Sequence, residues 1–238
     1  HPMTAADCAF FLTAENGLPV QDEKGSFVLD EEAVTAYVQS LAEEYDGYGR
    51  TRQFHSTRGD VITIDGGTYG SKMDRKKETA YLLEHLLDPG VHTGTPQSHI
   101  PSYEREAFCY GKNDIGDTYI EVDMTEQKMY YYEKGVLKLE TEIVTGNMRR
   151  RMGTPEGVNF VYNKQKNRVL RGPGYASPVK FWMPVKGGIG IHDAGWRKEF
   201  GGDIYQTAGS HGCINTPKDK MEELFDCVQI GTPVVMFY

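Results

Sequence analysis

The segment Tyr119-Ile120-Glu121-Val122-Asp123-Met124 alternates apolar and polar residues, which is the pattern of a β-strand that buries one face. Further segments rich in β-branched and aromatic residues follow it. They are Lys128–Tyr132, Val136–Val144, Val158–Tyr162, Val179–Trp182, Ile189–His192 and Pro233–Tyr238. The turn-forming Glu133-Lys134-Gly135 separates the first two of these, which predicts an antiparallel hairpin. This part of the chain is therefore predicted to be a mostly antiparallel, sandwich-like β domain.

One helix is expected to pack within this β domain. Apolar residues recur at helical spacing from Met221 to Val228, and Gly231 follows them. Thr216 is placed to cap the helix, and Pro217 suits its first position because that position needs no backbone N–H. The fold class of this half is therefore β-rich with a single packed helix.

The first half of the chain has a mixed pattern. Asp30 can cap a helix whose apolar residues continue at helical spacing to Tyr45, and Asp74 can cap a second helix that Pro89-Gly90 ends. The β-branched run Val61-Ile62-Thr63-Ile64 lies between them and predicts a strand. These features indicate a small α+β module.

The boundary between the two halves is expected near residue 112. Residues 91–116 contain several prolines and glycines and show little periodicity, as in a linker or a covering segment. We therefore predict that residues 1–112 form the α+β module plus its linker. Residues 113–238 are predicted to form a second domain that carries the chemistry.

Composition and charge argue against several classes of protein. Of the 238 residues, 39% are hydrophobic and 25% are charged, as in ordinary globular proteins. The net charge of −8 argues against nucleic acid as a partner, since phosphate binding needs a basic surface. The basic run Met148-Arg149-Arg150-Arg151-Met152 is interpreted as a solvated loop. We also expect no membrane span in this chain, because no apolar run is long enough.

The densest cluster of reactive residue types is Ser210-His211-Gly212-Cys213-Ile214-Asn215, which follows a Gly-rich stretch. Glycines let backbone N–H groups crowd close to a cysteine, and a nearby imidazole increases the fraction of nucleophilic thiolate. Backbone N–H groups on a tight turn at His211, Gly212 and Cys213 are natural donors to the oxyanion of a tetrahedral intermediate. The cluster therefore indicates that the Cys213 thiol attacks a carbonyl carbon.

Two histidines are candidates for the base that activates this thiol. His211 is two residues from Cys213, so the two side chains face the same way on an extended chain. His192 ends an apolar strand that would hold its ring firmly. Its neighbour Asp193 offers a carboxylate and a backbone carbonyl to fix the tautomer. The residues alone leave both candidates open.

The remaining reactive side chains have simpler interpretations. A zinc site built from His192, His211 and Cys213 has suitable ligand types, but no fourth ligand is evident and no C-x-x-C pair occurs. We therefore expect neither a metal nor a cofactor. The other three cysteines are interpreted as inert, small apolar side chains. They are Cys8, Cys109 and Cys227.

The reactive cluster resembles the signature of the L,D-transpeptidase family, whose catalytic domain is called YkuD-like. That signature is a His, a spacer and then Ser/Thr-His-Gly-Cys-x-Asn, which here are His192 and Ser210–Asn215. Other segments also match the family. They are Val144-Thr145-Gly146-Asn147, Thr154-Pro155-Glu156-Gly157, Trp182-Met183-Pro184, Ile191-His192-Asp193-Ala194 with Trp196, and Gly231-Thr232-Pro233-Val234-Val235. The first half is similar to the peptidoglycan-binding module of Gram-positive members, most visibly at Gly66-Gly67-Thr68-Tyr69-Gly70.

The resemblance implies a peptidoglycan L,D-transpeptidase. Cys213 would attack the carbonyl of the third residue of a tetrapeptide stem, release D-Ala and form a thioester. The side-chain amine of a neighbouring stem would resolve the thioester into a 3→3 cross-link. Water in its place would give an L,D-carboxypeptidase. Carbapenems are expected inhibitors because they acylate this family, and a wall-binding protein with an inert catalytic domain is the remaining alternative.

The resemblance also implies roles for individual residues. Matched by position, His192 is the general base or ion-pair partner of Cys213, and the backbone carbonyl of Asp193 orients it. An ion pair would keep the thiol reactive toward alkylating reagents well below pH 8.5. His211 takes a supporting role beside the thiol and the oxyanion site. The amides of Gly212 and Cys213 are the expected oxyanion donors.

Further expectations concern the surroundings of the reaction. Ser210 and Asn215 are expected to brace the reactive loop, and Tyr175 and Trp182 are expected aromatics of the substrate cleft. A peptidoglycan substrate implies an extracytoplasmic location at the cell wall. The protein would reach it by export or by an anchor in sequence that this chain lacks.

Overall fold

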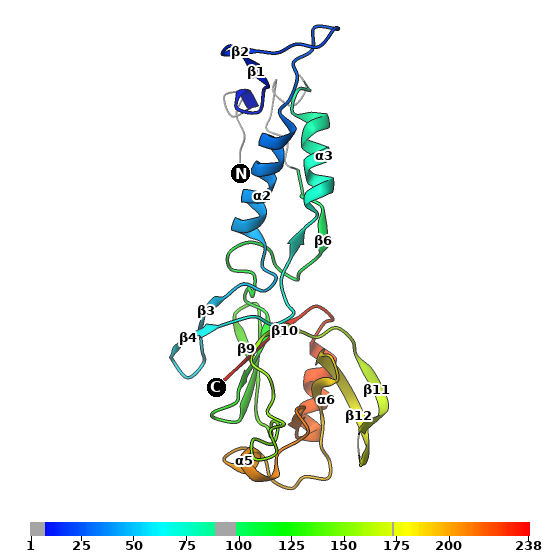
Figure 1. Ribbon diagram of the computed structural model, residues 1–238. Coiled ribbons are helices and arrows are strands. Elements are labelled where there is room, and N and C mark those ends of the chain that lie inside the picture. The colour runs from blue at the N-terminus through cyan, green and yellow to red at the C-terminus, as the bar shows by residue number, and fades with distance from the viewer. Residues whose placement is uncertain (1–7, 89–98, 173) are drawn as a thin grey trace. The chain divides into compact units, whose positions relative to one another are not determined.

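The computed structural model describes residues 8–88, 99–172 and 174–238 (Figure 1). These residues form two compact units. One unit comprises the chain up to Asp46 together with Ser71–Glu106, and the other comprises Gly47–Gly70 together with Ala107–Tyr238. The chain therefore passes between the units three times. The Pro89-Gly90 pair that was expected to end a helix lies outside the described residues.

Both predicted helices of the first unit are confirmed as α2 (Glu31–Tyr45) and α3 (Arg75–His85). The carboxylates of Asp30 and Asp74 cap them, each accepting the backbone N–H three residues on, at 3.0 and 3.2 Å. The unit also contains two short antiparallel strand pairs. These are β1 (Ala14–Glu15) with β2 (Leu18–Pro19), and β5 (Lys72–Met73) with β6 (Tyr103–Arg105). The α+β class of this module is confirmed.

The second unit contains two sheets. The five-stranded sheet has the order β10 (Gly157–Phe160), β15 (Pro233–Phe237), β7 (Tyr119–Asp123), β8 (Lys128–Glu133) and β9 (Val136–Glu142). The four-stranded sheet has the order β11 (Gln165–Gly172), β12 (Tyr175–Lys186), β13 (Ile189–Asp193) and β14 (Ile214–Thr216). Within these sheets, β15 with β7 and β13 with β14 are parallel, and the other pairs are antiparallel. The predicted β-rich domain is confirmed.

A single buried cluster joins both sheets to helix α6 (Lys218–Cys227). Ile120 of β7, Ile191 of β13 and Leu224 of α6 belong to it and have no exposed surface. The expected cap of α6 is wrong, because Thr216 is the last residue of β14 and Pro217 takes the N-cap position without a side-chain hydrogen bond. A further helix, α5 (Ile204–Ala208), was not anticipated from the sequence.

A hairpin from the first half of the chain belongs to the second unit. Its strands are β3 (Arg52–His55) and β4 (Val61–Ile64), and β4 coincides with the predicted β-branched strand. The Phe54 ring packs 5.9 Å from that of Phe237 in β15, inside a buried cluster. The division therefore differs from the expected boundary near residue 112, because the apolar face of the hairpin is buried against the second unit.

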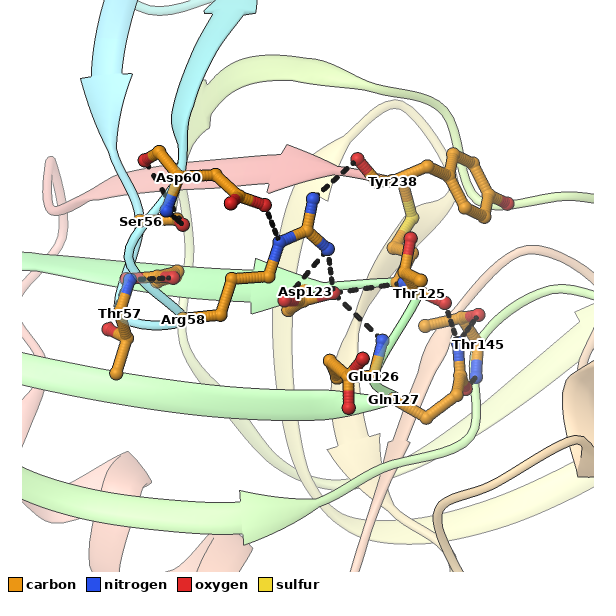
Figure 2. A network of polar contacts seen from close by, with 12 residues as sticks. Ser56, Thr57, Arg58, Asp60, Asp123, Thr125, Glu126, Gln127, Thr145 and Tyr238 are labelled. Atoms are coloured by element: carbon orange, nitrogen blue, oxygen red, sulfur yellow. Dashed lines mark hydrogen bonds and ion pairs between the residues drawn. The ribbon is translucent and has the colours of Figure 1, made fainter.

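Charged side chains fasten this hairpin in two places. The Arg52 guanidinium donates to both carboxylate oxygens of Asp114, at 2.8 and 2.6 Å, and both side chains are buried. Arg58, at the turn, lies 3.2 Å from Asp123 of β7 and donates to the backbone carbonyl of Tyr238 at 3.2 Å (Figure 2). Asp123 also accepts two backbone N–H groups of the turn that follows β7. Because a buried carboxylate needs such partners, the contact ties the hairpin to β7.

No helix among the described residues is both long enough and apolar enough to cross a membrane. The basic run at residues 148–152 is exposed, as expected of a solvated loop.

Candidate active site

A cavity of about 190 Å³ opens in the second unit at one end of β13 and β14. Several of the residues that the sequence singled out line it together. They are Tyr175, His192, Ser210, His211, Cys213 and Asn215. Its lining does not include the other three residues singled out, which are Gly212, Asp193 and Trp182. The cavity therefore unites the reactive cluster with His192 across the chain.

Backbone pairing fixes the loop that carries Cys213. The Ser210 N–H donates to the Thr145 carbonyl at 2.9 Å, and the Asn147 N–H donates to the Ser210 carbonyl at 2.9 Å. Asn215 exchanges two backbone hydrogen bonds of 2.9 Å with Val144. The family motif at residues 144–147 therefore serves as the strand-like support of the reactive loop.

Two hydroxyl groups brace the loop from within. Ser210 Oγ donates to the Cys213 carbonyl at 2.6 Å and accepts the Gly212 N–H at 3.0 Å. Thr154 Oγ1 accepts the Gly146 N–H at 2.9 Å and donates to the Gly212 carbonyl at 2.8 Å. Gly212 has φ +116°, which L side chains rarely adopt, so this turn requires glycine. The peptide plane between Gly212 and Cys213 is therefore held on its carbonyl side.

The Cys213 N–H, on the opposite side of that peptide plane, donates to none of the described residues. The Gly212 N–H is already engaged by Ser210. Of the two amides expected to stabilise an oxyanion, only that of Cys213 is therefore unoccupied.

His192 is buried on β13, directly beside Asn215 on the parallel strand β14. Its Nδ1 lies 2.9 Å from the backbone carbonyl of Asp193, and a carbonyl only accepts, so Nδ1 carries the proton. The neutral ring then has its lone pair on Nε2. Burial lowers the pKa of His192, the hydrogen bond to the Asp193 carbonyl and the Asp193 carboxylate oppose this in part, and the positive charge of Arg197 adds to it. The arrangement favours a neutral imidazole that can accept a proton through Nε2.

The Cys213 thiol is partly buried and points toward the turn between β12 and β13. Its Sγ lies 3.8 Å from the Gly188 carbonyl. Burial raises the pKa of Cys213, and the Gly190 N–H opposes that effect only in part. Among the described residues no hydrogen bond joins Sγ to His192. The geometry and both pKa shifts thus favour a neutral thiol beside a neutral imidazole at rest, instead of the ion pair considered from the sequence.

His211 lies at the mouth of the cavity. Its ring is exposed and stacks on the Tyr175 ring, with centroids 4.5 Å apart and planes inclined by 22°. The short sequence spacing to Cys213 does not by itself make His211 the partner of the thiol. No hydrogen bond joins the two side chains among the described residues.

Two predicted site residues, Trp182 and Asp193, do not line the cavity and instead contact His192. Trp182 is buried, with its ring centroid 5.9 Å from that of His192, so it packs against the histidine and does not line the cleft. The Asp193 carboxylate accepts the Phe181 N–H at 2.7 Å, and only its backbone carbonyl contacts the His192 ring.

Several lining residues were missed by the sequence reasoning. They are Leu170, Ser177, Trp196, Arg197 and Gly209. Trp196 lies within a segment that matches the family, which was the one available signal. Nothing in the pattern around Arg197 or in the polar β11 indicated a contribution to the site. Among the described residues, no group of three or more His, Cys, Asp or Glu side chains is placed to hold a metal ion.

Comparisons with known proteins agree with this geometry. Residues 117–236 match the L,D-transpeptidase catalytic domain family, YkuD, and residues 14–90 match a peptidoglycan binding domain family. A search among curated proteins found no match. The two matched domains imply a role at the cell wall, outside the cytoplasm.

Two solved structures resemble most of the chain. The crystal structure of an Enterococcus faecium L,D-transpeptidase with a Cys-to-Ser substitution is 38% identical, with a TM-score of 0.82 over 99% of this chain and 90% of that chain. The structure of the Ldtfm–avibactam carbamoyl enzyme is 39% identical, with a TM-score of 0.80 over 92% of this chain and 85% of that chain. This chain belongs to the L,D-transpeptidase family and is a cysteine-dependent acyltransferase.

Proposed function

We propose that this enzyme joins peptidoglycan stems through a thioester on Cys213, with His192 as the base. The donor is a tetrapeptide stem and the acceptor is the side-chain amine of a second stem. The observation that carries the proposal is the cavity itself. It unites a thiol, an imidazole of fixed tautomer and the loop that bears an unoccupied backbone N–H.

The first half of the reaction forms the thioester. His192 Nε2 takes the proton of the thiol as Sγ bonds to the carbonyl carbon of the third stem residue. The oxygen of that carbonyl becomes an oxyanion, and the Cys213 N–H donates to it. When the intermediate collapses, the C–N bond breaks and D-Ala leaves with the proton that His192 held. The imidazole is neutral again.

The second half resolves the thioester. His192 Nε2 accepts a proton from the acceptor amine as its nitrogen bonds to the thioester carbon. The C–S bond then breaks and the proton returns to sulfur, which leaves a 3→3 cross-link. His211, stacked on Tyr175, supports the entrance, and Ser210 and Asn215 keep the loop in place.

Mass spectrometry of a disaccharide-tetrapeptide incubated with the protein tests this proposal. Dimers that have lost one D-Ala are expected with the unmutated protein and absent with Cys213→Ala. Cys227→Ala is a matched control, because Cys227 is an exposed thiol outside the cavity. Tripeptide without dimer would indicate an L,D-carboxypeptidase instead. An unchanged substrate would indicate either that this stem has the wrong chemistry or that the catalytic domain is inert and only binds the wall. Formation of a carbapenem adduct would point to the first, and its absence to the second.

β-Lactams are proposed inhibitors of the same thiol. One similar structure is a carbamoyl enzyme formed with avibactam, which supports covalent modification of such enzymes by acylating inhibitors. A carbapenem is expected to add its full mass to the unmutated protein and nothing to Cys213→Ala. An adduct of equal yield on both proteins would assign the reactive group elsewhere.

The location is proposed on the same grounds. Residues 14–90 bind peptidoglycan and residues 117–236 cross-link it, so the protein acts in the wall, reached through export or an anchor. The match to a peptidoglycan binding domain supports this, and co-sedimentation of the protein with purified wall sacculi tests it.

A further inference from the structure

Arg197 is the cation of the cavity, and none of the described carboxylates pairs with it. Its side chain is partly buried and lines the same cavity as Cys213 and His192. No Asp or Glu of the described residues lies within ion-pair distance of its guanidinium. Burial lowers the pKa of Arg197, as expected when water is removed and no anion replaces it. A partly buried charge without an ionic partner gains when a ligand supplies the opposite charge.

The charge of the cavity is opposite to that of the protein. The whole chain has a net charge of −8, yet the lining contains no acidic residue, and its fixed charge is that of Arg197. A cavity with such a lining attracts an anionic group of the substrate.

Two hydrogen bonds hold the Arg197 guanidinium in place and leave its other N–H donors unused. Its Nε donates to Asn215 Oδ1 at 3.3 Å, and Nη2 donates to the Ala208 carbonyl at 2.9 Å. A guanidinium has five N–H donors, so three remain, including both on Nη1. These two contacts fix the orientation of the planar group, which suits it to a planar acceptor such as a carboxylate.

We propose that Arg197 binds the terminal carboxylate of the donor stem and so selects stems that end one residue beyond the bond to be broken. The assignment rests on the proposed function. In such a donor only a nitrogen and a Cα separate the attacked carbonyl carbon from the terminal carboxylate carbon. A donor that places its carbonyl at Cys213 therefore places that carboxylate in the same cavity. The carboxylate departs with D-Ala, and Arg197 is vacated before the acceptor attacks.

The test compares two donors that differ only at this group. The disaccharide-tetrapeptide is used with its free carboxylate and as the C-terminal carboxamide, and kcat/KM for release of the fourth residue, D-Ala or its amide, is measured for each. We expect the unmutated enzyme to prefer the carboxylate by about 10- to 100-fold, the range of a charge-assisted hydrogen bond. Arg197→Gln should reduce this ratio to near 1, and Arg197→Lys should retain part of it.

Matched controls separate binding from folding. The ratio is taken within each variant, so a change in the amount of active protein cancels. Lys198→Gln removes one positive charge from the adjacent exposed residue, which does not line the cavity, and its ratio should equal that of the unmutated enzyme. A third donor, amidated at another carboxylate of the stem, should keep the full rate.

Other outcomes would overturn the assignment. Equal rates on both donors with the unmutated enzyme, or a ratio that Arg197→Gln leaves intact, would show that Arg197 does not bind this carboxylate. A preference that appears only with the third donor would move the contact to another carboxylate of the stem. If the unmutated protein converts neither donor and no carbapenem adduct forms, the proposed function itself fails.

Discussion

The floor and the rim of the cavity are built differently. The floor consists of His192, Cys213 and Asn215, held by the parallel pairing of β13 with β14 and by backbone bonds to residues 144–147. The rim consists of Tyr175 and its neighbours on β11 and β12, with the exposed His211 stacked on them. β11 is the edge strand of its sheet and pairs only with β12. The comparison teaches that the reactive side chains are held by backbone pairing, while the rim depends on a ring stack and on a strand that is exposed on both faces.

The largest effect is expected on the floor. His192→Asn removes the Nε2 lone pair, and we expect kcat for cross-linking to fall by about 10²- to 10⁴-fold, the usual contribution of a general base. His55→Asn is the matched control, since His55 lies exposed on β3 and outside the cavity. Thermal unfolding checks that both variants fold. Full activity of His192→Asn would remove His192 from the floor chemistry and favour His211.

A smaller loss is expected when the floor is loosened indirectly. Thr154→Val leaves the Gly146 N–H and the Gly212 carbonyl without their shared hydroxyl. Unsatisfied buried groups cost about 1–3 kcal/mol. We expect kcat to fall about 10-fold with little change in KM, because the Cys213 N–H loses its direction. Thr154→Ser should restore kcat, and a loss that serine does not restore would assign the effect to packing of the methyl group.

The pH dependence of alkylation compares the ionisation of the Cys213 thiol on the floor with that of free cysteine in solvent. Burial raises the pKa of Cys213 and lowers that of His192. The thiol therefore stays protonated to higher pH than the thiol of free cysteine, whose pKa is about 8.5. Iodoacetamide labelling, followed by mass spectrometry of the Cys213 peptide, should lag behind free cysteine at pH 8 and increase above it. Rapid labelling at pH 6 would instead demonstrate an ion pair with His192.

The smallest effect is expected at the rim. Tyr175→Ala removes the ring on which His211 stacks, and aromatic pairs contribute about 0.5–1.5 kcal/mol beyond burial. We expect kcat/KM to decrease a few-fold, mainly through KM, while Tyr175→Phe stays close to the unmutated enzyme. A decrease in kcat as large as that of Thr154→Val would mean that the rim shapes the chemical step and would weaken the distinction drawn above.

The same distinction explains what the sequence could predict. The floor could be predicted because its residues lie in short sequence motifs. The expected orientation of His192 by the Asp193 carbonyl is confirmed. The rim was predicted only in part: Tyr175 and His211 were singled out, but Leu170 of β11 was not. The reason is that β11 begins Gln165-Lys166-Asn167-Arg168, whose polar residues do not show the alternation of a half-buried strand, because this strand is exposed on both faces. Arg197 was missed for a related reason, since its importance comes from which charges are absent around it, and only the folded chain shows that.

Capping aspartates and β-branched runs predicted most elements of the first half of the chain. They did not predict to which of the two units each element belongs. The hairpin of β3 and β4 reads locally like part of the α+β module, and its place depends on long-range partners such as Asp114 and Phe237. Such contacts between residues far apart in sequence leave no periodic trace. The Thr216 cap failed similarly, because that residue is needed to extend β14 beside Asp193.

Because the chain passes between the two units three times, the units cannot be separated by a single cut. Cleavage by a protease at any one crossing divides at least one of the two units between the two fragments. Excision after residue 106 would discard Gly47–Gly70 and with it the partner of Asp123, exposing the apolar surface that Phe54 covers. Fusion at a single point cannot exchange these units between proteins without dividing at least one of them.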